Sequence, residues 1–77
     1  MSCRLLHRID PSRNMARFYR VEMLYDLFGA ITVERCWGRL GTHGQVRVAS
    51  FASDRVATET AAKLVGAKIR RGYVAID

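Results

Sequence analysis

The stretch Arg17–Tyr25 reads Arg-Phe-Tyr-Arg-Val-Glu-Met-Leu-Tyr and alternates between two kinds of side chain. Its even positions include the charged residues Arg20 and Glu22. Its odd positions carry large, mainly apolar side chains, which are Tyr19, Val21, Met23 and Tyr25. Strict alternation of this kind is typical of a strand with one buried face. We therefore predict a strand whose odd-numbered side chains face a core.

Two further strands are expected on the C-terminal side of this one. Asp26–Gly29 has the composition of a tight reversal, because aspartate bonds nearby backbone and glycine tolerates positive φ. The returning strand is expected from Ala30 to Trp37, with Ile31, Val33, Arg35 and Trp37 on one face. Gly38 is a candidate β-bulge. Gly41–Gly44 then predicts a second turn before a third strand, Gln45–Phe51.

The two ends of the chain supply the remaining elements. Leu5–Ile9 is expected to form a short edge strand, followed by a loop at Asp10–Asn14. A helix is expected over Asp54–Arg70, capped by the side chain of Ser53 or Asp54, and we expect a pair between Glu59 and Lys63. Arg71-Gly72 is a helix-ending signal, and Tyr73–Ile76 could add a last short strand or lie against the sheet.

These elements predict one domain, residues 1–77, of the α+β class. We expect an antiparallel sheet of about four to five strands with one amphipathic helix packed on one face. On the helix, Ala57, Ala61, Leu64, Val65 and Lys68 fall on the side expected to meet the sheet. A chain of 77 residues is too short for two separate cores.

The charge of the chain is strongly positive, since 13 basic residues face 7 acidic ones and give a net charge of +6. Eleven of the basic residues are arginine, whose planar guanidinium can grip a phosphate at two points. A polyanion is one partner that this composition indicates. The alternative is an ordinary solvated surface whose arginines reflect the codon usage of a GC-rich genome.

Several classes of function find no support in the sequence. Cys3 and Cys36 are too few for a disulfide framework, which favours a reducing cytoplasm. The chain shows no signal-peptide core, and no apolar run of the roughly 20 residues that a membrane span needs. His7 and His43 lack partners at metal-ligand spacing. A triad of Ser50, His43 and Asp54 has no supporting nucleophile motif, so we expect a non-enzyme without cofactor or metal.

The functional motif is expected at Cys36–Gln45, which holds the only tryptophan and three of the six glycines. The run Trp37-Gly38-Arg39, followed by Gly41-Thr42 and Gly44-Gln45, resembles the WGR domain, a small module of poly(ADP-ribose) polymerases and of bacterial proteins. Three other landmarks extend this resemblance over nearly the whole chain. They are Arg17-Phe18-Tyr19, Asp26-Leu27-Phe28-Gly29 and Lys68-Ile69-Arg70-Arg71-Gly72-Tyr73, in an order like that of the bacterial short form.

The resemblance implies a sheet with one packed helix, and it also implies a contact with DNA. In the break-sensing polymerases the motif tryptophan packs on a terminal sugar, and the motif arginine meets the backbone and neighbouring domains. These roles would fall on Trp37 and Arg39, with Gly38 between them. The chain lacks the zinc fingers, regulatory domain and catalytic domain of those enzymes. The expected function is that of a free-standing module that binds DNA or another nucleic acid.

The chemistry of the motif is compatible with that expectation. An indole ring can stack on a base or sugar while a guanidinium pairs with phosphate. Gly41 and Gly44 would let backbone amides approach an anion, and Thr42 could donate a further hydrogen bond. Arg35 and Arg47, and Arg20 if it shares their face, are candidates to extend the phosphate track. The predicted nucleic-acid-binding residues are Trp37, Gly38, Arg39, Gly41, Thr42, Arg35, Arg47 and Lys68.

Three alternatives remain open from the sequence. Trp37 could be a core residue, with glycines that only form a turn. The same tryptophan and arginine could form a hot spot for a protein partner, in which both residue types are enriched. Lys68 either extends its aliphatic stem along the apolar surface, which is slightly favoured, or projects at the helix end towards the motif.

Overall fold

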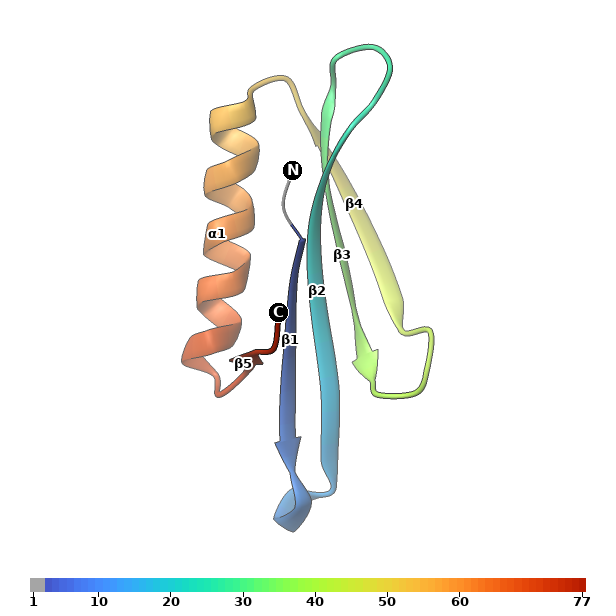
Figure 1. Cartoon of the computed structure of the whole chain (residues 1–77), viewed down its shortest axis with the longest axis vertical. Coiled ribbons are helices and arrows are strands. Elements are labelled where there is room, and N and C mark those ends of the chain that lie inside the picture. Colours follow the sequence, from blue (N-terminus) through green and yellow to red (C-terminus); the bar gives the residue numbers. More distant parts are fainter. Residues whose placement is uncertain (1–2) are drawn as a thin grey trace.

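The computed structural model describes residues 3–77 and contains one sheet and one long helix (Figure 1). In chain order the strands are β1 (Cys3–Asp10), β2 (Met15–Tyr25), β3 (Ile31–Arg39), β4 (Gln45–Phe51) and β5 (Val74–Ala75). A 3-10 turn, η1 (Pro11–Arg13), joins β1 to β2, and the helix α1 (Asp54–Arg70) lies between β4 and β5. The α+β class and the single helix on a five-stranded antiparallel sheet confirm the prediction.

The strands lie in the order β4-β3-β2-β1-β5, and all neighbours are antiparallel. The predicted strands were short by one or two residues at several ends, where the alternation fades before the strand pairing ends. The prediction that the first strand is an edge strand was wrong over part of its length. Leu6 and His7 pair with Ala75 and Val74 of β5, a contact between distant segments that local pattern does not encode.

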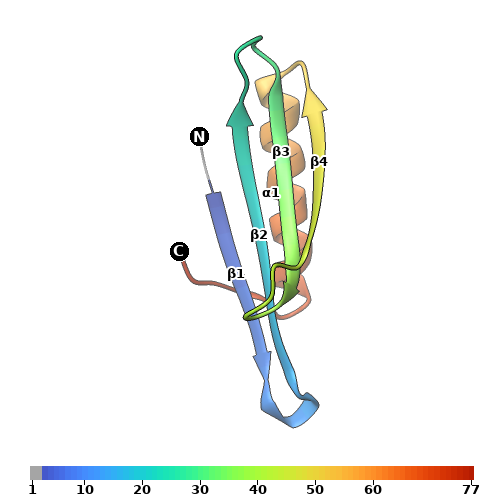
Figure 2. The same ribbon diagram turned by 90° about the vertical axis from the view of Figure 1, so that its right-hand side faces the viewer.

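The core lies between α1 and one face of the sheet, as Figures 1 and 2 show from two sides. The odd positions of β2 and β3 supply most of it, because alternate side chains of a strand share one face. The buried side chains of this core are Leu6, Tyr19, Val21, Met23, Ile31, Val33, Ala57, Val65 and Tyr73. The predicted inward face of β2 is therefore confirmed for its three central odd residues.

The helix begins and ends where the sequence indicates. The hydroxyl of Ser53 accepts a hydrogen bond of 3.3 Å from the amide of Val56, which caps the first turn. Gly72 follows the last turn with φ +97°, and its amide donates to the carbonyl of Ile69. The expected Glu59–Lys63 pair is not formed. Glu59 instead accepts from Arg55 at 3.2 Å, one turn earlier on the same exposed face.

The helix covers only part of the sheet. In Figure 1 the hairpin between β1 and β2 extends beyond the C-terminal end of α1, and the hairpin between β2 and β3 extends beyond its N-terminal end. The molecule is accordingly elongated, with principal extents of 46 × 23 × 17 Å. One end of the sheet's helix-side face is thus left open below the helix, and β3 carries the motif residues to that end.

Candidate functional site

Trp37 lies on the helix-side face of β3, in line with Ile31, Val33 and Arg35, as the period of the strand predicts. It pairs with Tyr19 of β2 on one side and with Gln45 of β4 on the other. Its ring is half-buried and packs against the edge of the core. Trp37 is therefore neither a fully enclosed core residue nor a free surface ring, because its outer part borders two hollows.

The two hollows flank Trp37 at the uncovered end of the sheet. One has a volume of about 460 Å³ and is lined by Arg13, Asn14, Met15, Arg17, Trp37, Gly38, Arg39, Lys68 and Tyr73. The other has a volume of about 250 Å³ and is lined by Tyr19, Arg35, Trp37, Arg47 and Lys68. We call the surface formed by both hollows the cationic face. It combines aromatic rings with several cations, and its residues come from five elements, η1, β2, β3, β4 and α1, and from the loops beside them.

Lys68 is the residue of the helix that reaches this face. Its Nζ lies 4.9 Å from the ring centre of Tyr19 and 5.3 Å from that of Tyr73, within the range of cation–π attraction. Partial burial lowers the pKa of the Lys68 amine, and the nearby charges of Arg71, Arg17 and Arg35 lower it further. The structure thus selects the less favoured of the two alternatives, an amine directed towards the motif.

Arg35 and Arg47 lie opposite one another on β3 and β4, and both face the second hollow. The guanidinium carbon of Arg35 is 5.6 Å from the ring centre of Trp37, so the cation lies over the indole. Two arginines directly across a strand pair repel each other. A bound anion between them would relieve that repulsion.

Arg39 has a structural contact of its own. Its Nη1 donates a hydrogen bond of 3.1 Å to the carbonyl of Asn14, and the next residue, Leu40, donates from its amide to Ala16. Arg39 therefore ties the end of β3 to the start of β2, while its side chain remains exposed and lines the first hollow. Asn14 itself takes the left-handed conformation, with φ 53°, that the loop composition indicated.

Gly41 and Thr42 lie in the turn after β3 and line neither hollow. The Thr42 hydroxyl donates a hydrogen bond of 2.7 Å to the carbonyl of Arg39, which closes the turn. Gly41 has φ +89°, a conformation that other residues adopt only at a cost. In this structure both residues shape the turn that follows the motif.

Gly38 does not form the β-bulge that its composition indicated. The β2–β3 register runs without interruption through Phe18↔Gly38 to Arg17↔Arg39. The reason for glycine is space, because a Cβ at Gly38 would lie 2.8 Å from the Cα of Gly44. At Gly44 a Cβ would in turn clash with the Trp37 carbonyl and lie 2.8 Å from the ring of Phe18. The two glycines let the turn fold back onto the strand that carries Trp37.

Arg20 does not join the phosphate track. It has the even parity of β2, so it lies on the sheet face away from the helix. There it forms ion pairs with Glu22 at 3.0 Å and with Glu34 at 3.3 Å. Its charge is therefore already compensated.

Most of the acidic residues lie away from the cationic face. Asp26, Asp54 and Glu59 lie at or near the β2–β3 hairpin and the first half of α1, and Glu22 and Glu34 lie on the opposite sheet face. Asp10 pairs with Arg13 at 3.7 Å, at the rim of the first hollow. Within residues 3–77, no carboxylate lies within salt-bridge distance of Arg17, Arg35, Arg39, Arg47 or Lys68.

Sequence reasoning brought Trp37, Arg35, Arg39, Arg47 and Lys68 to this face but did not assign Arg17 or Tyr73 to it. Arg17 shares the odd parity of Tyr19, so the strand pattern held a signal that it faces the helix side. Tyr73 follows the helix and packs edge-on to Tyr19, with ring centres 6.4 Å apart. Its position depends on the β1–β5 pairing, which sequence alone did not provide.

No group of three histidine, cysteine, aspartate or glutamate side chains among residues 3–77 is arranged to hold a metal ion. In the same part of the chain, no helix is long and apolar enough to cross a membrane.

Fold and surface together define a small α+β domain with an aromatic, cation-rich face at one end of its sheet. The chain belongs to the WGR domain family, whose model matches residues 2–77. The resemblance stated from the motif is thereby confirmed.

Individual relatives agree with this assignment. The chain is 44% identical over 68 residues, or 88% of its length, to the uncharacterized protein y4dW of Sinorhizobium fredii. It is 40% identical over 38 residues, 49% of its length, to Protein YehF of Escherichia coli. A crystal structure of a Bacteroides fragilis protein superposes with a TM-score of 0.83 and 28% identity over 99% of the chain.

These relatives are much longer than the chain. It spans 33% of y4dW, 14% of Protein YehF and 20% of the Bacteroides fragilis protein. The family and the fold of this domain are therefore common to chains of different length, and the free-standing state stays a prediction.

Proposed function

We propose that this WGR domain binds nucleic acid, in the first place DNA at an end or along its backbone, through the cationic face. The observation that carries the proposal is the setting of Trp37. Its half-buried ring separates two hollows, and all of their cations except Arg13 lack a carboxylate partner in the described chain. An aromatic surface between unpaired cations suits a ligand that has both flat rings and phosphates.

In this proposal each hollow holds a phosphate, and the Trp37 ring between the hollows contacts a sugar or base. In the first, Arg17 and Arg39 stand at opposite positions of β2 and β3, so a phosphate between them would meet two guanidinium groups. In the second, Arg35 and Arg47 form a similar pair. Lys68 borders both hollows and can serve either phosphate. Successive phosphates would then lie on either side of Trp37, with a sugar or base on the ring.

The remaining motif residues have a supporting role in this proposal. Gly38 and Gly44 allow the close approach that places Trp37, and Gly41 and Thr42 form the turn that holds the Arg39 backbone. Both hollows are open and are lined by cations and aromatic rings. We therefore propose a binding module without catalysis.

The proposal is tested by titrating the protein with a short duplex and following Trp37, the only tryptophan, by fluorescence. We expect saturable quenching whose affinity falls with salt by a log–log slope of about −0.9 per phosphate contacted. Arg47→Gln should weaken binding, whereas Arg55→Gln, on the exposed side of the helix, should leave it unchanged. Arg39→Ala is less informative, because it also removes the bond to Asn14. Equal affinities of the Arg47 and Arg55 variants would reject the proposed surface.

A second candidate function is a protein contact through the same face. It is supported by the mixture of rings and arginines, since tryptophan, tyrosine and arginine dominate protein hot spots. The two functions are separated by capturing partners from a lysate with and without nuclease. Partners that persist after nuclease treatment and depend on Trp37 would favour the protein contact, and loss of every partner would favour nucleic acid.

A further inference from the structure

Among residues 3–77, the most exposed large apolar side chains lie at the end opposite to the cationic face. Leu27 and Phe28, at the tip of the β2–β3 hairpin, are 98% and 95% exposed. They are adjacent in sequence and protrude beyond the N-terminal end of the helix, where Figure 1 shows the hairpin loop. A neighbouring pair of large apolar side chains with almost no intramolecular contact is a candidate interaction site.

The tip is held in a defined shape. The Asp26 carboxylate accepts hydrogen bonds from the amides of Phe28 at 2.8 Å and Ala30 at 2.9 Å. Gly29 closes the turn with φ +82°. The hydroxyl of Tyr25 donates to Asp54 at the start of the helix, which fixes the base of the hairpin. Binding a partner through Leu27 and Phe28 therefore costs little additional conformational entropy of the loop.

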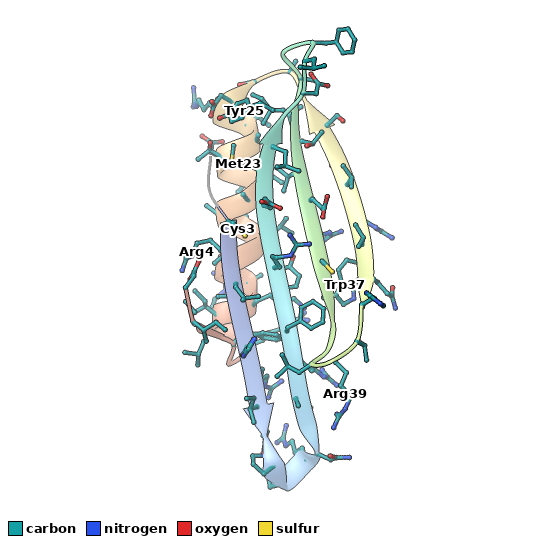
Figure 3. The ribbon with its side chains drawn as sticks, turned by 45° about the vertical axis from the view of Figure 1, so that its right-hand side comes forward. Cys3, Arg4, Met23, Tyr25, Trp37 and Arg39 are labelled. Atoms are coloured by element: carbon teal, nitrogen blue, oxygen red, sulfur yellow. The ribbon has the colours of Figure 1, made fainter. Side chains whose placement is uncertain are left out.

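An apolar hollow lies beside the middle of the helix, between α1 and the β1 side of the sheet. Its volume is about 240 Å³, and its apolar lining comes from Val21, Met23, Ala61, Ala62 and Val65. Arg4 also lines it, and Figure 3 shows Arg4 and Met23 on the helix side, away from Trp37 and Arg39. An apolar cavity of about 150 Å³ is enough for a benzene ring. The hollow can therefore take a phenylalanine side chain.

We propose that two copies of this chain form a closed dimer in which the tip of each enters the hollow of the other. The pairing is chemically matched, because the hollow is apolar and the tip offers the two most exposed apolar side chains. Asp26 adjoins the tip, and Arg4, whose Nε is paired with Asp77 at 3.2 Å, lines the hollow of the second copy and can direct its Nη atoms towards Asp26.

The location of the two features favours a closed dimer. The tip lies at one end of the molecule and the hollow beside the middle of the helix, so reciprocal insertion requires two antiparallel copies whose arginine-rich ends point away from each other. Reciprocal insertion uses one tip and one hollow of each copy, which closes the assembly at two. The cationic face is left uncovered in such a dimer, so this inference does not depend on nucleic-acid binding.

The dimer is expected to be weak. An aromatic side chain buries about 150–250 Å². Together, the two tips and the surfaces that they cover would bury an area close to the roughly 1,000 Å² at which specific protein interfaces begin. We therefore expect association in the micromolar to millimolar range, visible in a concentration series by sedimentation equilibrium. Phe28→Ser removes the tip and Ala62→Phe fills the hollow, so each variant should be monomeric. Val46→Ser, an exposed apolar change on β4, is the matched control and should dimerise normally.

A mixing experiment tests the reciprocity. Isotope-labelled Phe28→Ser keeps its hollow, and unlabelled Ala62→Phe keeps its tip. Adding unlabelled Ala62→Phe to labelled Phe28→Ser should shift the amide resonances of Thr58, Ala62 and Val65 in the labelled variant. Adding unlabelled Phe28→Ser should not shift them. Absence of shifts in the hollow at millimolar concentration, growth of the native chain beyond a dimer, or a native chain that stays monomeric would overturn the proposal.

Discussion

At the residue scale, two glycines of the motif are needed for backbone conformation and close packing in the turn after β3. Gly44 has φ +72° and also lies against the Trp37 carbonyl and the Phe18 ring. Gly41 has φ +89° but no heavy atom near the position of a Cβ. A side chain at Gly41 would therefore meet only backbone strain, whereas a side chain at Gly44 would meet the same strain and also a steric clash.

Alanine at these two positions should therefore have unequal effects. Gly41→Ala should lower the free energy of unfolding by about 1–2 kcal/mol, the usual cost of a left-handed conformation. Gly44→Ala should lower it by about 2–4 kcal/mol, because overpacking adds to the same strain. Urea unfolding of both variants measures the difference. Equal losses would mean that the turn moves away freely and that the contact with Trp37 is unimportant.

Lys68 gives a second prediction at this scale. Its pKa is lowered in the folded state, by partial burial first and by neighbouring arginines second, so folding favours loss of its proton. The penalty is present below the folded-state pKa and disappears as the pH rises towards the unfolded value of about 10.5. Lys68→Met should therefore be more stable than the native chain near pH 7, with a difference that shrinks at higher pH.

The measurement is a set of urea midpoints between pH 7 and pH 10.5. Cation–π attraction of the Lys68 amine to Tyr19 and Tyr73 acts against the predicted gain. A variant that is less stable than the native chain at pH 7 would show that the attraction outweighs desolvation.

At the element scale, the local sequence pattern predicted the strands and the helix. It did not predict the features that depend on pairing between segments distant in the sequence. The alternation of β2 and β3 predicted that Arg35 and Trp37 share a face, because parity alone decides it. The same parity placed Arg20 on the other face. Adjacency in sequence was a poor guide for Gly41 and Thr42, since a turn carried them away from both hollows. Arg17 and Tyr73 join the face only through strand register and through the β1–β5 pairing.

The helix cap gives a prediction at this scale. Ser53 satisfies the amide of Val56, and Asp54 adds a negative charge in the first turn. Ser53→Ala should cost about 0.5–2 kcal/mol in the free energy of unfolding. Ser53→Asp should retain most of the stability, because a carboxylate accepts the same hydrogen bond. If the alanine variant matched the native chain in urea unfolding, Ser53 would not be the cap.

At the scale of the whole molecule, unpaired cations and acidic residues are concentrated towards different ends of an elongated body. The cations without carboxylate partners in the described chain surround Trp37 at one end, and the acidic residues of the hairpin and helix start lie towards the other. The net charge of +6 does not by itself favour one surface, and this distribution supports the one that we propose. The proposed nucleic-acid contact and the proposed dimer contact use different residues, so each can be removed without the other.

The two lysines of the chain provide the most direct test of the proposed nucleic-acid surface. Lys68 borders both hollows, whereas Lys63 lies exposed on the same helix and lines neither. Lys68→Met and Lys63→Met carry equal net charge, so fluorescence anisotropy of a labelled duplex compares position alone. The account predicts that Lys68→Met weakens binding and reduces the magnitude of the log–log salt slope by up to about 0.9, while Lys63→Met keeps the native slope. Identical slopes and affinities for the two variants would contradict binding at the cationic face.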